Sequence, residues 1–170
     1  MPPANLPVRP TTDMAREGLF NILNNYLDFE ECTVLDLFAG TGAVSVEFMS
    51  RGVREAFSVD RNASCVNFIR STAERLNLAN LHAVRADAFE FIKGSRRGYD
   101  LIFADPPYDL ENVDTLPDLV LEGGLLADDG LFILEHSEQH DYTDHPAFWQ
   151  MRRYGKVHFT FFHKATEADA

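Results

Sequence analysis

The sequence predicts an α/β fold: an open, mostly parallel sheet with helices on both faces and one antiparallel edge strand. Short apolar runs typical of buried strands alternate with segments whose apolar residues recur at helical spacing. Such parallel strands are joined by right-handed crossovers through the helices. Near the end, the β-rich run 157–163 follows Tyr154-Gly155-Lys156, which suits a tight hairpin turn. This hairpin accounts for the antiparallel strand.

The elements follow in order along the chain. Thr12 or Asp13 is expected to cap a first helix, because apolar residues from Ala15 to Tyr26 recur at helical spacing. Strands are expected at residues 33–38, 56–59, 81–85, 101–104, 130–135, 151–154 and 157–163. Helices are expected at 43–50, 63–76, 88–92 and 116–122, with Gly123-Gly124 ending the last of them.

Length and composition indicate one soluble domain. The 170 residues are predicted to form a single domain over 1–170, with an irregular lead-in at 1–12 and a tail at 164–170. No apolar stretch approaches the roughly 20 residues of a membrane-spanning helix, and the first residues lack the pattern of a secretory signal. We therefore expect a cytoplasmic protein in which Cys32 and Cys65 are free, buried thiols.

The net charge of −12 is unevenly distributed. Residues 1–97 are nearly neutral, whereas residues 98–151 contain 13 acidic side chains and no Lys or Arg. A protein that binds bare nucleic acid unaided normally carries a basic face. The charge pattern disfavours strong autonomous binding, although Arg9, Arg16 and Arg61 are suitably placed to contact RNA phosphates.

The most informative segment is an apolar strand that leads into Asp105-Pro106-Pro107-Tyr108. The two prolines fix φ and remove two N–H donors, and the first proline holds Asp105 extended. The result is a stiff turn that carries a carboxylate, free carbonyl groups and an aromatic ring. These groups suit binding of a flat ring that bears an amine, which indicates nucleobase chemistry.

A glycine-rich turn follows the first strand and begins at a carboxylate, Asp36. The residues from Asp36 to Gly42 read DLFAGTG, which is neither the GxGxxG pattern nor a phosphate-binding loop with its Lys. The glycines allow a sharp turn and a close approach of a ligand to the backbone. Asp36 would repel a pyrophosphate but can hold a cationic amino group, such as the methionyl ammonium of S-adenosylmethionine.

Three further acids follow the next three strands. At this edge of such a sheet, Asp60 is placed to bind ribose hydroxyls. Asp87 can accept a hydrogen bond from an adenine amino group, with Phe89 or Asn62 packed against the adenine ring. The alternative is that each acid merely caps the helix after it. Four acids at successive strand ends, together with the glycine-rich turn, favour a ligand site.

With these motifs, the chain resembles the class I S-adenosylmethionine-dependent methyltransferases. The combination of RPTTD at 9–13, LDLFAGTG at 35–42 and DPPY at 105–108 is similar to the bacterial guanine-N2 methyltransferases of small-subunit ribosomal RNA. The resemblance implies a Rossmann-like, seven-stranded sheet with S-adenosylmethionine bound across the carboxyl ends of the strands. It also implies ribosomal RNA as partner. The acidic stretch 98–151 favours RNA presented in an assembled small-subunit particle over bare RNA, and we expect a monomer without a metal.

The resemblance also implies the roles of individual residues. The catalytic motif would be Asp105, Pro106, Pro107 and Tyr108. The cofactor would contact Asp36, Phe38, Ala39, Gly40, Thr41, Gly42, Asp60, Arg61, Asn62, Asp87, Ala88 and Phe89, with Arg9, Thr11 and Thr12 closing over it. Two features depart from the family pattern: family members usually have a basic hairpin before the RPT segment, where eight residues precede Arg9, and a basic residue where this chain has Met14.

Other assignments remain open. The chain could be a methyltransferase for another planar amine or amide, such as a DNA adenine or a protein glutamine, or a non-catalytic cofactor-binding protein of ribosome assembly. His136 and His140 have a spacing that could bind metal on a helix, but they follow a predicted strand and lack the HExxH order. A supporting role for His136 near the pocket is favoured over a metal site. Trp149 is expected to pack at the sheet edge.

Overall fold

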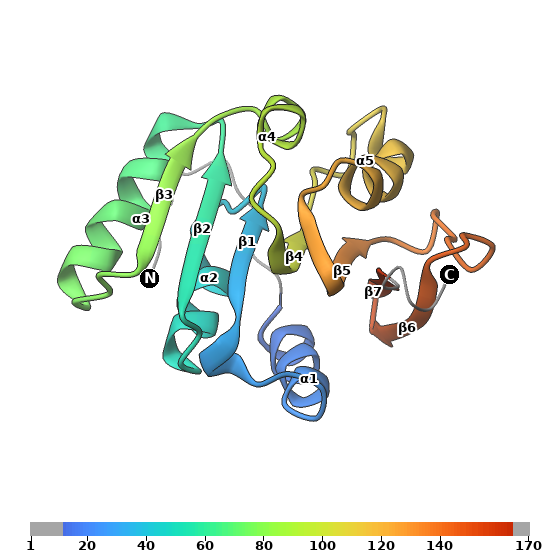
Figure 1. Ribbon diagram of the computed structural model, residues 1–170, viewed down its shortest axis with the longest axis horizontal. Coiled ribbons are helices and arrows are strands. Elements are labelled where there is room, and N and C mark those ends of the chain that lie inside the picture. Colours follow the sequence, from blue (N-terminus) through green and yellow to red (C-terminus); the bar gives the residue numbers. More distant parts are fainter. Residues whose placement is uncertain (1–11, 165–170) are drawn as a thin grey trace.

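Seven strands form one sheet in the order β3-β2-β1-β4-β5-β7-β6 in the computed structural model, which describes residues 12–164 (Figure 1). The strands are β1 (Thr33–Leu37), β2 (Glu55–Asp60), β3 (Leu81–Arg85), β4 (Tyr99–Ala104), β5 (Leu126–His136), β6 (Phe148–Tyr154) and β7 (Val157–His163). The helices are α1 (Asp13–Leu23), α2 (Ala43–Ser50), α3 (Ala63–Arg75), α4 (Ala88–Gly94) and α5 (Leu116–Glu122), with short 3-10 turns at η1 (Phe29–Glu31) and η2 (Val113–Thr115).

The sheet is parallel from β3 to β5, and the strand order reverses at β1. β1 pairs in parallel with β2 on one side and with β4 on the other, and β4 pairs in parallel with β5. β7 runs antiparallel to both of its neighbours, β5 and β6. The predicted seven-stranded, mostly parallel sheet with one antiparallel edge is confirmed: the β6–β7 hairpin forms this edge, with the antiparallel strand β7 next to the edge strand β6.

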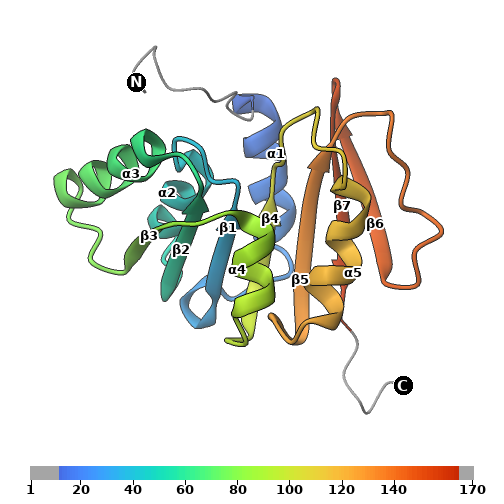
Figure 2. The ribbon, with the colours of Figure 1, turned by 90° about the horizontal axis from the view of Figure 1, so that it is seen from above.

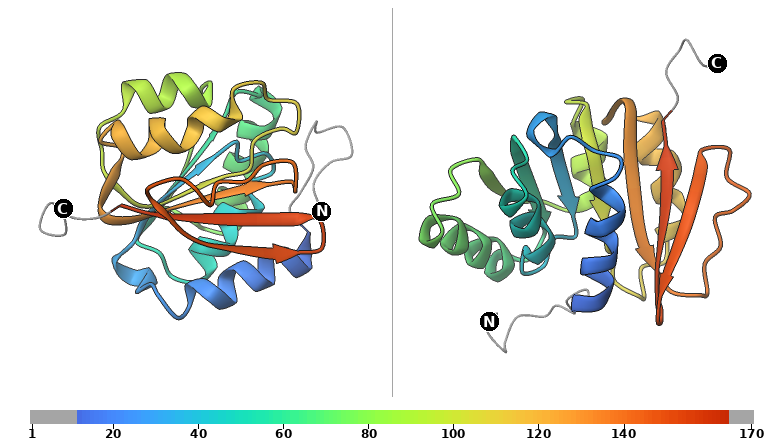
Figure 3. Two further views of the ribbon diagram at one scale, coloured as in Figure 1. Left: turned by 90° about the vertical axis from the view of Figure 1, so that its right-hand side faces the viewer. Right: turned by 90° about the horizontal axis from the view of Figure 1, so that it is seen from below.

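Helices cover both faces of the sheet. α1, α2 and α3 pack on one face, where Phe20 and Phe48 meet edge to face with ring centroids 4.6 Å apart. α4 and α5 cover the other face, through residues such as Ile92 and Val120. Figures 2 and 3 show α4 and α5 on one side of the strands and α1 on the opposite side. The central strands β1 and β4 are therefore buried on both sides, as their apolar runs predict.

The edge formed by β6 packs against α1. Thr12 caps this helix by accepting a hydrogen bond from the Ala15 amide at 3.2 Å. Gly18 lies so close to Tyr154 that a Cβ there would overlap its ring. In the turn after α1, the Tyr26 ring meets Trp149 of β6 edge to face, with centroids 4.8 Å apart. The expected packing of Trp149 at the sheet edge is confirmed.

Several predicted boundaries were wrong by a few residues. β1 ends at Leu37 rather than at residue 38, because Phe38 has a φ of 59° and turns the chain out of the strand. β5 starts at Leu126 rather than at residue 130, with Asp129 at a φ of 61° and an irregular register opposite β4. The sequence shows only the apolar second half of this strand, since its first half is partly exposed.

Three further predictions concern the cysteines, membrane-spanning helices and the residues before α1. Cys32 and Cys65 are buried free thiols, as expected, and burial raises the pKa of each to about 11. Within residues 12–164, no helix is long and apolar enough to cross a membrane. Arg9 and Thr11 lie outside the described residues.

Candidate active site

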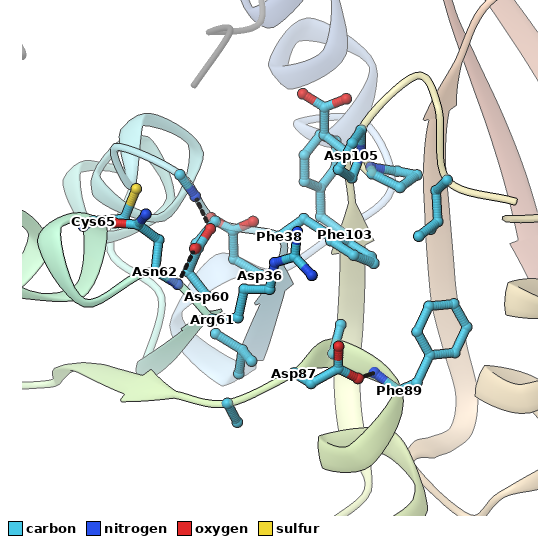
Figure 4. Close-up of a pocket in the computed structure, with 18 of the residues that line it drawn as sticks. Asp36, Phe38, Asp60, Arg61, Asn62, Cys65, Asp87, Phe89, Phe103 and Asp105 are labelled. Atoms are coloured by element: carbon cyan, nitrogen blue, oxygen red, sulfur yellow. Dashed lines mark hydrogen bonds between the residues drawn. The ribbon is translucent and has the colours of Figure 1, made fainter. Parts of the chain in front are cut away.

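A cavity of about 820 Å³ opens where the carboxyl ends of β1, β2, β3 and β4 meet, an edge that we call the site rim. Its lining includes all four acids that follow the parallel strands (Figure 4): Asp36, Asp60, Asp87 and Asp105. The cavity lies beside the reversal of strand order at β1, where ligands bind in open α/β sheets. The acids predicted from separate strand ends therefore surround one space.

The glycine-rich turn forms one wall of this cavity. Phe38, Gly40 and Gly42 all have positive φ values, of 59°, 58° and 80°, so the chain reverses sharply between β1 and α2. Ala39, Gly40 and Thr41 line the cavity. Gly42 does not line it; a Cβ there would come within 2.8 Å of Ile69 on α3, so this glycine allows α2 and α3 to pack closely.

Asp36 lies at the inner end of the cavity and is only 2 % exposed. Its Oδ2 accepts a hydrogen bond of 2.6 Å from the Ser45 hydroxyl, which lies 2.6 Å from the Ser58 hydroxyl. Burial raises the pKa of Asp36 from 3.8 to about 7, against the lowering effect of the Ser45 hydrogen bonds. A neighbouring cation, such as a ligand ammonium, would favour the ionised form.

The raised pKa of Asp36 predicts a pH-dependent stability of the ligand-free protein. Folded Asp36 holds its proton up to about pH 7, whereas the unfolded chain loses it near pH 4. The free energy of unfolding therefore falls as the pH rises through this window, by up to about 4 kcal/mol. Denaturant unfolding across the window should show this fall in the wild type and a flatter profile in Asp36→Asn, which keeps an acceptor for Ser45. Parallel profiles would contradict the prediction.

Asp60 joins the glycine-rich turn to β2 and α3. Its Oδ2 accepts the Gly40 amide and its Oδ1 accepts the Asn62 amide, each at 2.9 Å. Each carboxylate oxygen can accept a second hydrogen bond. Asp60 can therefore bind a pair of hydroxyls while it holds the turn, which agrees with the predicted ribose contact.

Asp87 caps α4 and also lines the cavity. Its Oδ1 accepts the Phe89 and Glu90 amides at 3.0 and 3.2 Å, so the capping alternative considered from the sequence is realised here. Capping uses only Oδ1, and Oδ2 retains acceptor capacity toward the cavity. The two roles are compatible in one carboxylate. Arg61, Asn62, Ala88 and Phe89 complete this part of the lining.

The turn from Asp105 to Tyr108 forms the wall opposite the glycine-rich turn, and all four of its residues line the cavity. The Leu110 amide donates to the Pro107 carbonyl at 3.1 Å, which closes the turn. Asp105 is half-buried, whereas the Tyr108 side chain is 64 % exposed. A carboxylate and an aromatic ring therefore stand together at the mouth of the cavity.

His136 supports this turn from the neighbouring strand. It ends β5 and shares a small void of about 20 Å³ with Asp105, Pro106 and Pro107. Its Nδ1 faces the Ser137 carbonyl at 2.7 Å and its Nε2 faces the Thr160 hydroxyl at 2.6 Å. Because burial lowers its pKa, the ring is neutral, Nδ1 donates and Nε2 accepts from Thr160. This geometry agrees with a supporting role for His136.

Some predicted residues lie elsewhere, and some lining residues were missed. Thr12 does not line the cavity but caps α1. Residues missed from the sequence include Cys65 in the first turn of α3 and Phe103, whose side chain faces the cavity two positions before Asp105. The segment after the DPPY turn also contributes: Asp109, Leu110, Glu111 and Asn112. The position of this segment directly after the DPPY motif could have identified it as part of the site from the sequence. Within residues 12–164, no group of three or more His, Cys, Asp or Glu side chains could hold a metal ion.

The family model described as "Conserved hypothetical protein 95" matches residues 2–163, and so spans the sheet, the cavity and both motif turns. The chain belongs to this family. It is 33 % identical over 140 residues to a Bacillus subtilis protein named "Putative rRNA methyltransferase YlbH", covering 80 % of this chain and 75 % of that protein. It is also 27 % identical to "Ribosomal RNA small subunit methyltransferase D" of Escherichia coli K12, covering 96 % of this chain and 83 % of that one.

Solved structures of other proteins share the fold of this chain. The Escherichia coli protein named "Putative methyltransferase yhhF" superposes with a TM-score of 0.83 at 25 % identity, over 95 % of this chain and 91 % of that one. A protein from Thermus thermophilus superposes with a TM-score of 0.79 at 28 % identity, over 94 % and 90 % of the two chains. Fold and family together make this protein a class I methyltransferase of the rRNA methylase type.

Class I methyltransferases of this type use S-adenosylmethionine, and the cavity fits it. The volume of about 820 Å³ is sufficient for a nucleoside joined to an amino-acid chain. Three carboxylates line the cavity, those of Asp36, Asp60 and Asp87, and the cofactor carries three kinds of donor: an ammonium, ribose hydroxyls and an adenine amine. The sharp turn at Gly40 exposes backbone to the cavity.

Proposed function

We propose that this protein transfers a methyl group from S-adenosylmethionine to the exocyclic N2 amine of a guanine in small-subunit ribosomal RNA. One observation carries the proposal: the Asp105–Tyr108 turn lines the same cavity as Asp36, Asp60 and Asp87. The turn that suits binding of a flat amine therefore lines the same cavity as the groups that suit binding of the methyl donor. The names of the relatives support ribosomal RNA as the substrate.

The chemistry required of the protein is alignment of the amine. The lone pair of an exocyclic amine is delocalised into the purine ring, so the nitrogen is a poor nucleophile. Hydrogen bonds from its two protons to Asp105 and to the Pro106 carbonyl would favour a pyramidal nitrogen and direct its lone pair at the methyl group. They would also stabilise the positive charge that develops on nitrogen. The cofactor, when bound, supplies the methyl group and its leaving group.

Asp105 favours guanine over adenine as the target. An ionised Asp offers two acceptor oxygens and no donor. Guanine presents an N1–H and an N2 amine on the same edge, and both can donate to such a group. Adenine presents its own acceptor at N1, which a carboxylate would repel. The base must be unpaired or flipped out of its helix to reach the cavity.

The acidic segment supports a substrate presented in an assembled small-subunit particle. Residues 98–151 contribute Asp109 and Glu111 to the mouth of the cavity, where they would repel the phosphates of bare RNA. We further propose a single domain over residues 1–170 that acts in the cytoplasm as a monomer, without a metal. The other candidates are methylation of a DNA adenine or of a protein glutamine, and a non-catalytic, cofactor-binding role in ribosome assembly.

The experiment is transfer of a labelled methyl group to four acceptors: small-subunit ribosomal RNA, assembled small subunits, DNA and a glutamine-containing peptide. We expect label in RNA, and a faster reaction with assembled subunits than with naked RNA. Label in DNA or peptide alone would overturn the RNA assignment. Cofactor binding without transfer to any acceptor would favour the non-catalytic role.

Tyr108 gives a separate prediction on base binding. Its exposed ring can stack on the target base, and stacking contributes about 1–3 kcal/mol per base. Tyr108→Ala is therefore expected to raise KM for RNA about 5- to 150-fold. Tyr108→Phe keeps the ring and should stay close to wild type. Equal KM values for the two variants in steady-state transfer assays would exclude stacking.

A further inference from the structure

The β6–β7 hairpin ends at the site rim. β7 runs antiparallel to β5, and His158 near its start pairs with His136 at the carboxyl end of β5. The turn between Tyr154 and Val157 therefore lies at the same edge as the DPPY turn. Figure 2 shows this hairpin turn, the start of α1 and the connection from β4 to α5 along one edge of the molecule.

Three exposed cations lie at this end of the hairpin: Arg152, Arg153 and Lys156, which we call the basic tip. Arg152 uses its Nε to bond Gln150 at 2.9 Å, and Arg153 uses its Nε to bond the Gly155 carbonyl at 3.2 Å. In the part of the chain that the structure describes, none of the three pairs with a carboxylate. Their charges are held outward on a paired strand and a tight turn, with their terminal nitrogens available as donors.

The side of the site rim formed by the connection from β4 to α5 is acidic. Asp109 and Glu111 line the cavity mouth, and Asp114 follows them on η2. Further acids lie on α5 and in the connection from β5 to β6: Asp118, Glu138, Asp141 and Asp144. These acids belong to the face of the sheet that α4 and α5 cover, whereas the basic tip belongs to the edge strand β6, which packs against α1 on the other face. A polyanion that approaches over α5 is repelled, and one that crosses beside α1 and β6 is attracted.

The spacing suits a strand of nucleic acid. In the sheet order, β4, which carries the DPPY turn, is separated from β6 by β5 and β7. With neighbouring strands about 4.8 Å apart, the basic tip lies roughly 14 Å from the turn that holds the target base. A few nucleotides of single-stranded RNA span that distance, so phosphates flanking the target would reach the tip.

We propose that the basic tip binds the backbone phosphates of the RNA beside the target nucleotide, so that the strand crosses the site rim on the α1–β6 side. This inference rests on the proposed RNA methyltransferase function. Alternatively, the three cations are solvated surface charges with no partner. Phosphate contacts fix register without reading sequence, so loss of the tip should weaken RNA binding and leave the cofactor site intact.

The test compares two variants of equal charge. Arg152→Gln/Arg153→Gln/Lys156→Gln removes the basic tip. Arg75→Gln/Lys93→Gln/Arg96→Gln removes three exposed cations at the opposite ends of the strands, which lie away from the site rim. Both changes shift the net charge equally. Thermal unfolding and cofactor binding establish that each variant is folded. RNA binding is then measured against salt concentration, and kcat/KM is measured with ribosomal RNA and with assembled small subunits.

The tip variant is expected to lower kcat/KM for RNA at least about tenfold and to reduce the slope of log K against log salt by roughly 2–3. The control variant should stay within about twofold of wild type, and neither should change cofactor affinity. Equal losses in both variants, or no loss in the tip variant, would overturn the inference. Absence of RNA methylation by the wild type would contradict the proposed function instead, and the salt slopes would still decide whether the tip binds RNA.

Discussion

Asp105→Ala is expected to lower the rate of methyl transfer at least about 10²–10³-fold while the affinity for S-adenosylmethionine stays nearly unchanged. The carboxylate stands at the mouth of the cavity, on the turn opposite the glycine-rich turn. Its proposed partner is the amine, and its effect is greatest when that nitrogen gains positive charge. The loss should therefore appear in kcat and in single-turnover rates, with little change in cofactor binding measured by calorimetry.

Two further variants separate this role from a general effect of charge. Asp105→Asn keeps one acceptor oxygen but introduces a donor, so it should retain more activity than Asp105→Ala and far less than wild type. Asp144→Asn removes an exposed acid of the same segment and should behave as wild type. Single-turnover transfer by Asp105→Ala at the wild-type rate would refute the assignment.

Asp60→Ala is expected to weaken binding of S-adenosylmethionine about 100-fold or more. The substitution removes the acceptors that we propose for two ligand hydroxyls, and hydrogen bonds to a charged group contribute about 1.5–3 kcal/mol each. It also leaves the Gly40 amide without its 2.9 Å acceptor, so the glycine-rich turn loses its fixed position. Both effects act on the cofactor site and should raise the Kd for S-adenosylmethionine.

Asp28→Ala is the matched control for this prediction. Asp28 also accepts a backbone amide, that of Glu30 at 3.3 Å, but it lies before β1 at the opposite end of the strands. It should lose a little stability and keep cofactor affinity. If Asp60→Ala binds the cofactor as tightly as wild type, the ribose role assigned to Asp60 is wrong.

The sequence predicted the parallel part of the fold closely because its central strands, β1 and β4, are buried on both faces. Runs such as Leu101 to Ala104 have no polar alternation, and acids or glycines mark their ends. The prediction was weaker where one side of an element is exposed. The first half of β5, around Asp128 and Asp129, is partly solvated and lacks an apolar signal.

The candidate site was predictable to the extent that its residues end strands. In a parallel sheet, the carboxyl ends of neighbouring strands meet at one edge, so four separate acids could be assigned to one space. Contacts that depend on tertiary packing were not predictable. The chain from Asp36 through Ser45 to Ser58 joins β1, α2 and β2 and follows no spacing rule. The double role of Asp60 likewise appears only in three dimensions.

The net charge of −12 takes on a more specific meaning in the structure. Acids such as Asp109 and Glu111 line the cavity, whereas the hairpin that packs against α1 carries exposed cations. Net charge alone therefore does not describe the surface that a proposed RNA substrate would meet.

Analysis of the methylated nucleoside tests the central claim most directly. Small-subunit ribosomal RNA treated with the protein and labelled S-adenosylmethionine is digested to nucleosides and separated by chromatography with mass detection. The account predicts N2-methylguanosine, and no label when the target guanosine is replaced by inosine, which lacks the N2 amine. Label in methylated adenosine, or undiminished transfer to the inosine-containing RNA, would contradict it.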